Sequence, residues 1–107
     1  MKLEVQRLIL EVIAQLRPLV ARIRRQDRKL AGQLLDAANS MVLNTGEAEY
    51  SDPGTRRARF HSAAGSAGEV RAGLRAAVAW GYLAPEQARP ADDKLDVVLA
   101  IFWRLTH

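Results

Sequence analysis

The chain has 107 residues, of which 49% are apolar and 26% are charged, enough for the core of one globular domain and too few for two. It contains no cysteine, which excludes disulfides, thiolate metal sites and cysteine nucleophiles. Sixteen basic residues against twelve acidic ones give a net charge of +4, a balance that suits an anionic partner.

The N-terminal segment does not have the pattern of a leader sequence. Glu4 and Glu11 interrupt its apolar residues, and it lacks a small-residue cleavage site. No apolar run approaches the roughly 18 residues that a membrane span needs. We therefore expect a cytoplasmic protein that makes no contact with a membrane.

The first predicted helix runs from Leu3 to Ile23, because apolar residues recur there at intervals of three and four. A second apolar row widens its apolar face beyond what one neighbouring helix would cover. Pro18 lies inside this segment, where a proline removes a backbone hydrogen bond and crowds the preceding turn. We expect a kink there, or a fresh helix start with Pro18 in its first turn.

A second helix is predicted from Asp27, which suits the N-cap position, to about Ala48. The segment from Tyr50 to Gly54 is a predicted loop, because Asp, Pro and Gly in succession favour a turn. Thr55 is then the predicted cap of a third helix, which extends from about Arg56 to Trp80. The small residues of this helix would let a neighbouring helix approach closely.

Gly81 is suited to end the third helix, and Pro85 and Pro90 bracket a predicted connector. Asp92 or Asp93 then opens a fourth helix. With neither strand alternation nor an internal repeat, the sequence predicts an all-α fold: an antiparallel up-and-down four-helix bundle in which the whole chain is one domain. Apolar residues off the main faces of the first and fourth helices exceed what one core needs, which indicates self-association.

Four polar residues occupy positions where the second and third helices should carry apolar ones. Asn44 and Glu47 continue one apolar stripe, and Ser66 and Glu69 interrupt the other. In an antiparallel pair the two sets lie at similar distances from the turn, so we expect a structural polar core that fixes helix register. The alternative is a Glu47–Glu69 pair for metal binding or acid–base chemistry. It lacks the histidine three residues on that di-metal bundles use.

No residues have the spacing of a catalytic or cofactor site. The two histidines stand far apart in the sequence, His61 beside an arginine cluster and His107 at the last position. The sequence has no Gly-rich phosphate loop, nucleophile elbow or metal-ligand cluster. We therefore expect a non-enzymatic protein with no catalytic residue, no metal and no cofactor.

Arginines gather in two stretches of the chain. A charge run is often only a solvated helix face. Arginine, however, matches phosphate oxygens with its planar fork, which favours phosphate contacts. Aromatic residues do not alternate with these arginines, so sequence-specific binding of a single strand is not expected. The predicted nucleic-acid-binding residues are Arg17, Arg22, Arg24, Arg25, Arg28, Arg56, Arg57 and Arg59.

The middle of the chain resembles a known family of small four-helix bundle proteins. Residues 30–47 contain Gln-Leu-Leu-Asp-Ala-Ala-Asn-Ser and then Asn-Thr-Gly-Glu, similar to the Gln-Leu-x-x-Ala-Ala-x-Ser and Asn-x-x-Glu-Gly motifs of that family's second helix. Residues 60–70 and 81–83 are similar to its third helix and that helix's end. Ala48 departs from the pattern, where the family has glycine. The family comprises the ribosomal-RNA intervening-sequence proteins and the accessory variability proteins of diversity-generating retroelements.

This resemblance implies a bundle that assembles into a homopentamer. For the retroelement branch it also implies a particle that engages nucleic acid and a reverse transcriptase. The leading hypothesis is therefore a homo-oligomeric accessory protein that binds RNA or DNA through phosphate contacts without reading sequence, with a reverse transcriptase as a further partner. The alternative is a protein–protein interaction scaffold whose charge mainly serves solubility.

Overall fold

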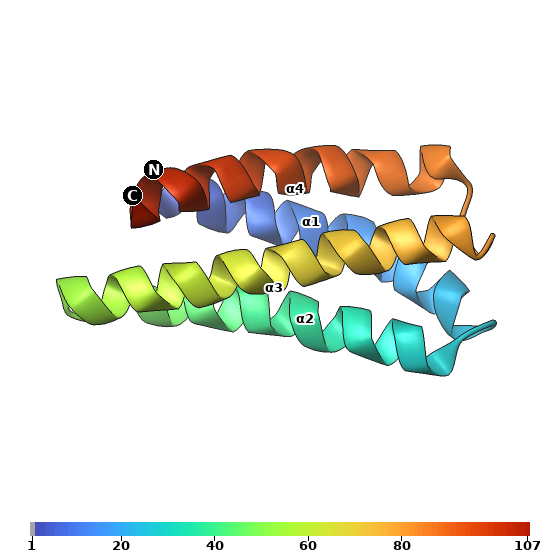
Figure 1. Cartoon of the computed structure of the whole chain (residues 1–107), viewed down its shortest axis with the longest axis horizontal. Helices are drawn as coiled ribbons and strands as arrows, with labels where there is room; N and C mark the ends of the chain where they lie inside the picture. The colour runs from blue at the N-terminus through green and yellow to red at the C-terminus, as the bar shows by residue number, and fades with distance from the viewer. Residues whose placement is uncertain (1) are drawn as a thin grey trace.

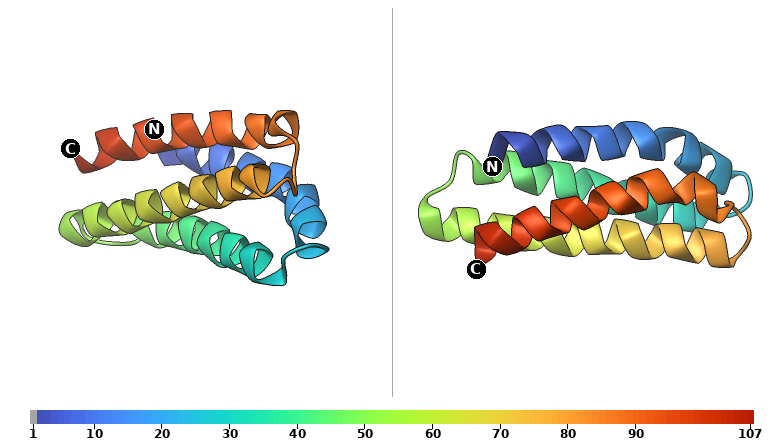
Figure 2. Two further views of the ribbon diagram at one scale, coloured as in Figure 1. Left: turned by 45° about the vertical axis from the view of Figure 1, so that its right-hand side comes forward. Right: turned by 90° about the horizontal axis from the view of Figure 1, so that it is seen from above.

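Four α-helices make up the part of the chain that this computed structural model describes, residues 2–107 (Figure 1). They are α1 (Lys2–Arg24), α2 (Arg28–Ala48), α3 (Pro53–Ala79) and α4 (Pro85–Thr106). Each helix packs antiparallel against the next, and α1 also packs against α4, which closes the bundle (Figure 2). The all-α, up-and-down four-helix architecture predicted from the sequence is confirmed. None of the four helices, over the described residues, is long and apolar enough to cross a membrane.

Each helix turns one apolar stripe into a shared core. At one end of the bundle the rings of Phe60 and Phe102 pack with their centroids 6.0 Å apart. Ile101 of α4, one of the apolar residues that the sequence places off the main face of the fourth helix, is only 1% exposed and belongs to the core. The other fully buried side chains include Ile9 of α1, Leu34 of α2, Leu74 of α3 and Leu95 of α4.

Helix α3 approaches α2 closely at Gly73. A β-carbon at this position would lie 2.6 Å from Cδ2 and 2.8 Å from Cγ of Leu34. Leu34 is 1% exposed and packed on all sides, so it has little room to move. The absence of a side chain at Gly73 thus makes room for Leu34 of α2.

The starts of α2 and α3 are both fixed by aspartate caps. Asp27 Oδ1 accepts a hydrogen bond from the Leu30 amide at 2.9 Å, so the predicted N-cap of α2 is confirmed. The prediction for α3 is wrong by one turn, because Asp52 caps this helix and Thr55 is the residue that donates to it, also at 2.9 Å. Pro53 suits the first position of a helix, where its missing amide proton costs nothing.

Helix α4 begins at Pro85, seven or eight residues before the predicted start at Asp92 or Asp93. Gly81 ends the preceding helix as predicted, with a φ of +80° that favours glycine. The predicted connector from Pro85 to Pro90 is instead helical, because Gln87 Oε1 accepts from the Ala84 amide at 2.8 Å and stabilises the first turn. Pro90 lies on the exposed side of α4, while the neighbouring Ala91 is buried against the core.

Helix α1 continues through Pro18 without a break, from Lys2 to Arg24. A fresh helix start at this proline is therefore ruled out. Pro18 lies on the exposed side of the helix, next to the buried Leu19. Burial of the apolar stripe on both sides of the proline holds the helix together across the missing hydrogen bond.

Ion pairs join α4 to its two neighbours. Arg71 of α3 donates to Asp92 and to Asp96, each at 3.0 Å, and the hydrogen bond from Arg71 lowers the pKa of the Asp92 carboxyl. Lys94 donates to Glu11 of α1 at 3.2 Å, and this bond lowers the pKa of the Glu11 carboxyl. Both sets are part-exposed, so they add orientation more than stability.

Candidate nucleic-acid interface

Exposed basic residues cluster around the turn between α1 and α2. Only three residues separate the two helices, held by hydrogen bonds from the amides of Gln26 and Asp27 to the Ile23 carbonyl, at 2.9 and 2.8 Å. Exposed basic residues therefore crowd around a single turn. We call this surface the basic end, and its members are Arg22, Arg24, Arg25, Arg28 and Lys29.

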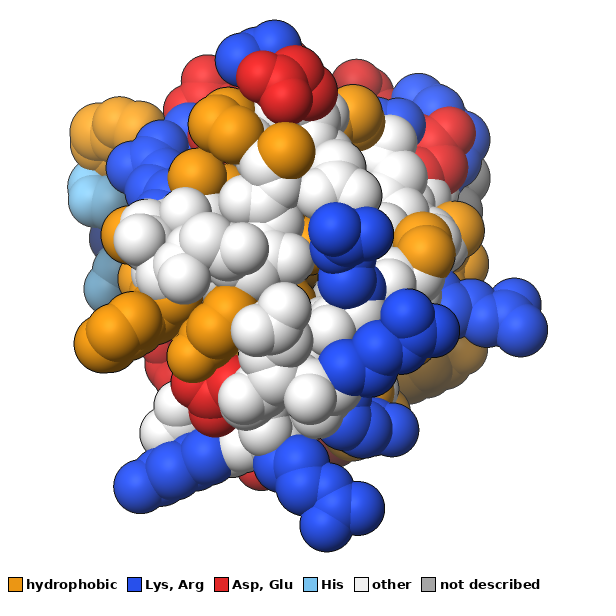
Figure 3. Space-filling model, turned by 90° about the vertical axis from the view of Figure 1, so that its right-hand side faces the viewer, with side chains coloured by type: hydrophobic (Ala, Val, Ile, Leu, Met, Phe, Trp, Pro, Cys, Tyr) orange, Lys and Arg blue, Asp and Glu red, His pale blue; other side chains and the backbone are white. Residues whose placement is uncertain are grey.

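The charge of the basic end is not neutralised within the chain. No carboxylate of the described residues forms an ion pair with any of its five members. Of these five side chains, only that of Arg22 has a hydrogen-bond acceptor among the described residues: its Nε donates to the backbone carbonyl of Tyr82 at 3.3 Å. Figure 3 looks onto this end of the bundle and shows Lys and Arg side chains projecting along its lower and right-hand side. These cations are free to contact an external anion.

Arg17 lies farther along α1 from the turn. Together with Arg24 it lines a hollow of about 260 Å³ between α1 and α2, next to Leu35 and Asn39. Arg17 is exposed, and no ion pair holds it among the described residues. It extends the basic end along the side of the bundle.

The second arginine cluster lies at the opposite end of the molecule and is engaged with the protein itself. Arg56 donates to the Ala48 and Ser51 carbonyls, at 3.3 and 3.2 Å. Arg57 donates to the Thr106 carbonyl at 2.9 Å. These bonds tie the start of α3 to the end of α2 and to the end of α4.

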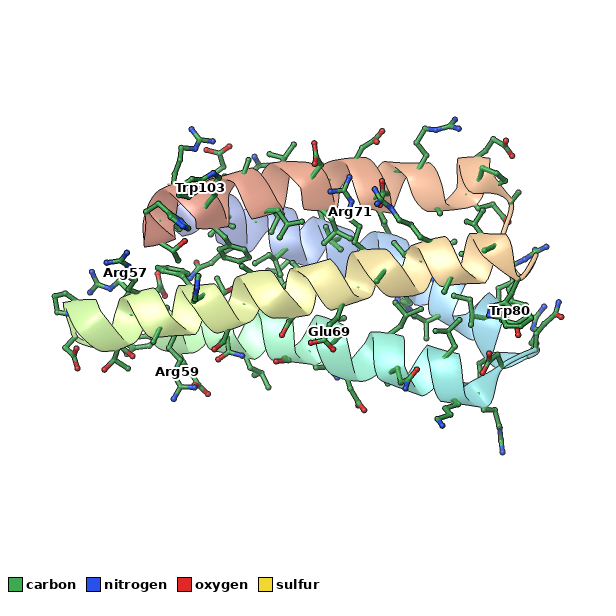
Figure 4. All side chains as sticks on the ribbon, viewed as in Figure 1. Arg57, Arg59, Glu69, Arg71, Trp80 and Trp103 are labelled. Carbon is green, nitrogen blue, oxygen red and sulfur yellow. The ribbon has the colours of Figure 1, made fainter. Side chains whose placement is uncertain are left out.

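Arg59 is similarly engaged. Its Nη1 lies 3.0 Å from Glu47 Oε2 and 3.4 Å from Asn44 Oδ1. Figure 4 shows Arg57 and Arg59 far from the end where the α3–α4 turn lies. The bundle is 42 Å long, so the eight arginines predicted from the sequence do not form one surface on a single chain.

The predicted polar core is only partly present. Ser66 is buried, and its hydroxyl lies 2.9 Å from that of Ser40 on α2. Asn44 is half-buried and donates to the Ser40 carbonyl at 3.0 Å within α2, so at this point the polar contact between α2 and α3 is made by Ser40 and Ser66. Ser40, which sequence reasoning missed, is the residue at its centre.

Glu47 and Glu69 do not belong to the core, and their assignment to it is wrong. Both are exposed, because Thr45 and Ala48 take the inward positions near Glu47 on α2, and Ser66 and Val70 take those near Glu69 on α3. Thr45 satisfies its buried hydroxyl by donating to the Met41 carbonyl at 2.8 Å. The exposed Glu69 side chain extends from α3 on the side of α2 (Figure 4), and the described residues contain no group of three potential metal ligands.

The fold brings the two histidines together, although they are far apart in the sequence. Their rings lie at the far end of the bundle from the basic end, with centroids 6.4 Å apart. His61 and His107 share a hollow of about 350 Å³ with Arg57. His107 Nδ1 lies 3.0 Å from the Trp103 carbonyl, a contact that fixes its ring at the end of α4.

Sequence reasoning also missed two aromatic residues beside the basic end. Tyr82, in the α3–α4 turn, donates its hydroxyl proton to Asp27 Oδ2 at 3.2 Å. Burial and this hydrogen bond raise the pKa of the Tyr82 phenol. Trp80 stacks against Tyr82, with ring centroids 6.4 Å apart and an angle of 14° between the rings. Because Asp27 and Tyr82 are 55 residues apart, no local sequence pattern marks this contact.

Comparison with known proteins identifies the fold. A crystal structure of a protein of unknown function from the S23 ribosomal protein family of Bacteroides thetaiotaomicron matches with a TM-score of 0.87 and 17% sequence identity, over 95% of this chain and 97% of that one. No protein-family model matches the sequence, and no curated protein matches it at a significant level. The likeness shows a shared four-helix fold. It agrees with the resemblance to intervening-sequence proteins at the level of the fold.

Proposed function

We propose that this protein is a non-enzymatic, homo-oligomeric accessory protein that binds nucleic acid through phosphate contacts at its basic end. The observation that carries the proposal is the set of five exposed cations around the α1–α2 turn, none paired with a carboxylate of the described residues. Four of the five are arginines, whose forked donors suit phosphate oxygens. Contacts of this kind give affinity without reading sequence.

The contributions of the two arginine clusters are not equal in this proposal. Arg56, Arg57 and Arg59 already donate to protein acceptors, so their replacement would disturb the ends of the helices. Arg24, Arg25 and Arg28 have no side-chain acceptor within the described residues. The phosphate-binding role is therefore centred on the α1–α2 turn, and the α3 arginines mainly support the fold.

The experiment that tests the proposal is a salt titration of binding to labelled RNA and DNA with the variant Arg25→Glu/Arg28→Glu. Removing one arginine–phosphate pair lowers the slope of log affinity against log salt by about 1, so we expect the slope to fall by about 2 in this double variant. Fluorescence anisotropy of the labelled strand measures the affinity at each salt concentration.

The control is Arg7→Glu/Arg104→Glu, which reverses two exposed charges near the opposite end of the bundle, although Arg7 also pairs with Glu11 at 3.1 Å. Both variants carry the same net charge, so a difference between them reports position and not total charge. Equal losses of affinity in the two variants would mean that only the overall charge matters. If the wild-type protein binds neither RNA nor DNA at moderate salt, the nucleic-acid proposal is wrong.

Self-association through the outer side of α1 and α2 completes the proposal. Leu10 is 60% exposed there and lines a hollow of about 190 Å³ with Val42 and Gly46. Leu35, 42% exposed, lines the second hollow, which contains Arg17. Apolar side chains along two neighbouring helices favour burial against another protein surface. The pentamer implied by the family resemblance is the assembly that we propose.

A protein partner is the second candidate function, and the same apolar side of α1 and α2 favours it. A reverse transcriptase is the partner that the resemblance to the retroelement branch proposes. If the protein is a single chain in solution and binds no nucleic acid, this apolar side would be free for such a partner. Measurement of the mass in solution separates the two cases.

A further inference from the structure

Trp80 is a large aromatic side chain that is exposed to solvent beside the basic end of the molecule. It follows the last residue of α3 and is 72% exposed, although tryptophan is usually well buried. Gly81 turns the chain directly after it, with a φ of +80°. Figure 4 shows Trp80 at the end of the bundle where the α3–α4 turn lies.

The position of the indole is fixed and not left to a flexible loop. Its ring stacks nearly parallel to that of Tyr82, at an angle of 14°. Tyr82 is in turn held by two hydrogen bonds: its hydroxyl donates to Asp27 in the α1–α2 turn, and its carbonyl accepts from Arg22 near the end of α1. Asp27 also caps α2. Tyr82 therefore connects Trp80 to the basic end: it stacks on the indole and forms hydrogen bonds with Asp27 and Arg22.

Single-stranded nucleic acid is bound by two kinds of group, cations and exposed aromatic rings, and both are present at the basic end. Cations hold the phosphates of the strand, and the ring stacks on a base. In a duplex the base faces are covered by neighbouring base pairs, so they are not available to a protein ring. A phosphate-only surface would not favour the single strand, because a duplex has the higher charge density.

We propose that Trp80 is a stacking platform for an unpaired base, and that the basic end thereby prefers single-stranded over double-stranded nucleic acid. This inference rests on the proposed function, because the arginines must first hold the strand. It adds a preference for strandedness and no base reading, since every base has a face on which a ring can stack.

The test uses the intrinsic fluorescence of Trp80. The chain contains two tryptophans, so Trp103→Phe leaves Trp80 as the single tryptophan reporter. The probes are oligouridylate RNA, oligothymidylate DNA and a duplex RNA, each of about 12 nucleotides or base pairs, in the size range of a single-strand binding site. We expect both single strands to quench Trp80 and the duplex to bind without quenching it.

Substitution gives the second readout. Trp80→Leu should weaken binding of the single strands by about 5-fold to 150-fold, the range for removal of one stacked base, and leave duplex binding unchanged. Trp80→Phe should restore part of the affinity because it keeps an aromatic face. Trp103→Leu, a matched control at the opposite end of the bundle, should bind as the wild type does.

Two outcomes would overturn the inference, and they are distinguishable from each other. If Trp80→Leu binds single strands as tightly as the wild type while Arg25→Glu/Arg28→Glu binds weakly, stacking is wrong and phosphate binding stands. If neither single strand nor duplex binds the wild-type protein, the proposed function fails and the stacking platform fails with it. Circular dichroism of each variant must first show an unchanged melting temperature.

Discussion

At the scale of single residues, Gly73 is a position that has no room for a side chain. A β-carbon there would overlap the side chain of Leu34, which is buried between α2 and α3. Gly68, five residues earlier on the same helix, has nothing within 4 Å of the same hypothetical atom. Two glycines in similar sequence surroundings therefore have different physical roles.

We predict that Gly73→Ala destabilises the protein by about 1–2 kcal/mol, because overpacking a core costs more than the gain in helix propensity returns. Gly68→Ala is the control and should stabilise it by about 0.5–1 kcal/mol. Urea unfolding followed by circular dichroism measures both. In a Leu34→Ala background the cost of Gly73→Ala should disappear, and its persistence would show that the overlap with Leu34 is not its cause.

At the scale of elements, α1 carries a proline in its interior and still forms one helix. Pro18 cannot donate a hydrogen bond to the residue four positions earlier, and its ring crowds that carbonyl. Pro85 differs, because it lies at the first position of α4, where no such bond is made. The two prolines should therefore respond differently to replacement by alanine.

We predict that Pro18→Ala raises the free energy of unfolding by about 1–2 kcal/mol, since it restores one hydrogen bond and removes a clash. The gain is reduced because proline also restricts the unfolded chain. Pro85→Ala should be neutral or slightly destabilising. Thermal unfolding of the two variants measures the difference, and an equal response would contradict this account of α1.

The sequence predicts those features that depend on neighbouring residues. The number of helices, the Asp27 cap and the stop at Gly81 all follow from local patterns, and all are confirmed. The start of α4 does not follow from them, because prolines at positions 85 and 90 suggest a connector. Burial of Ala88 and Ala91 against the other helices outweighs that local signal.

The candidate site also has one part that local sequence predicts and one part that depends on long-range contacts. The cations of the basic end are adjacent in the sequence, so their clustering could be predicted. Trp80 and Tyr82 join them only through long-range contacts across the turns. Glu47 is misplaced by sequence reasoning because the helical stripe of α2 continues equally well through Thr45, which the packing turns inward. On α3 the packing turns Ser66 and Val70 inward and leaves Glu69 exposed.

At the scale of the whole molecule, exposed apolar residues are unevenly distributed. Leu10 and Leu35 line hollows between α1 and α2, whereas Val97 of α4, 47% exposed, lines neither of these two hollows. A charge placed in a buried interface is costly, while a charge on an open helix face is not. Substitutions at these positions therefore separate an interface from ordinary surface.

We predict that the wild-type protein has several times the 11.8 kDa mass of one chain, and that Leu10→Glu and Leu35→Glu each reduce it to that of a single chain. Val97→Glu, the control, should keep the wild-type mass. Light scattering coupled to size-exclusion chromatography measures all four. A wild-type mass of one chain would overturn the proposed assembly, and an effect of Val97→Glu alone would move the interface to α4.

An even number of helices returns the chain to the end from which it started. The beginning of α1 and the end of α4 lie side by side at one end of the bundle, and the α1–α2 and α3–α4 turns lie at the other (Figure 1, Figure 2). A fluorescent domain or affinity tag fused to either terminus would be attached about one bundle length from Trp80 and its neighbouring arginines. Fusion proteins and surface-immobilised protein should therefore present this end to solution without obstruction.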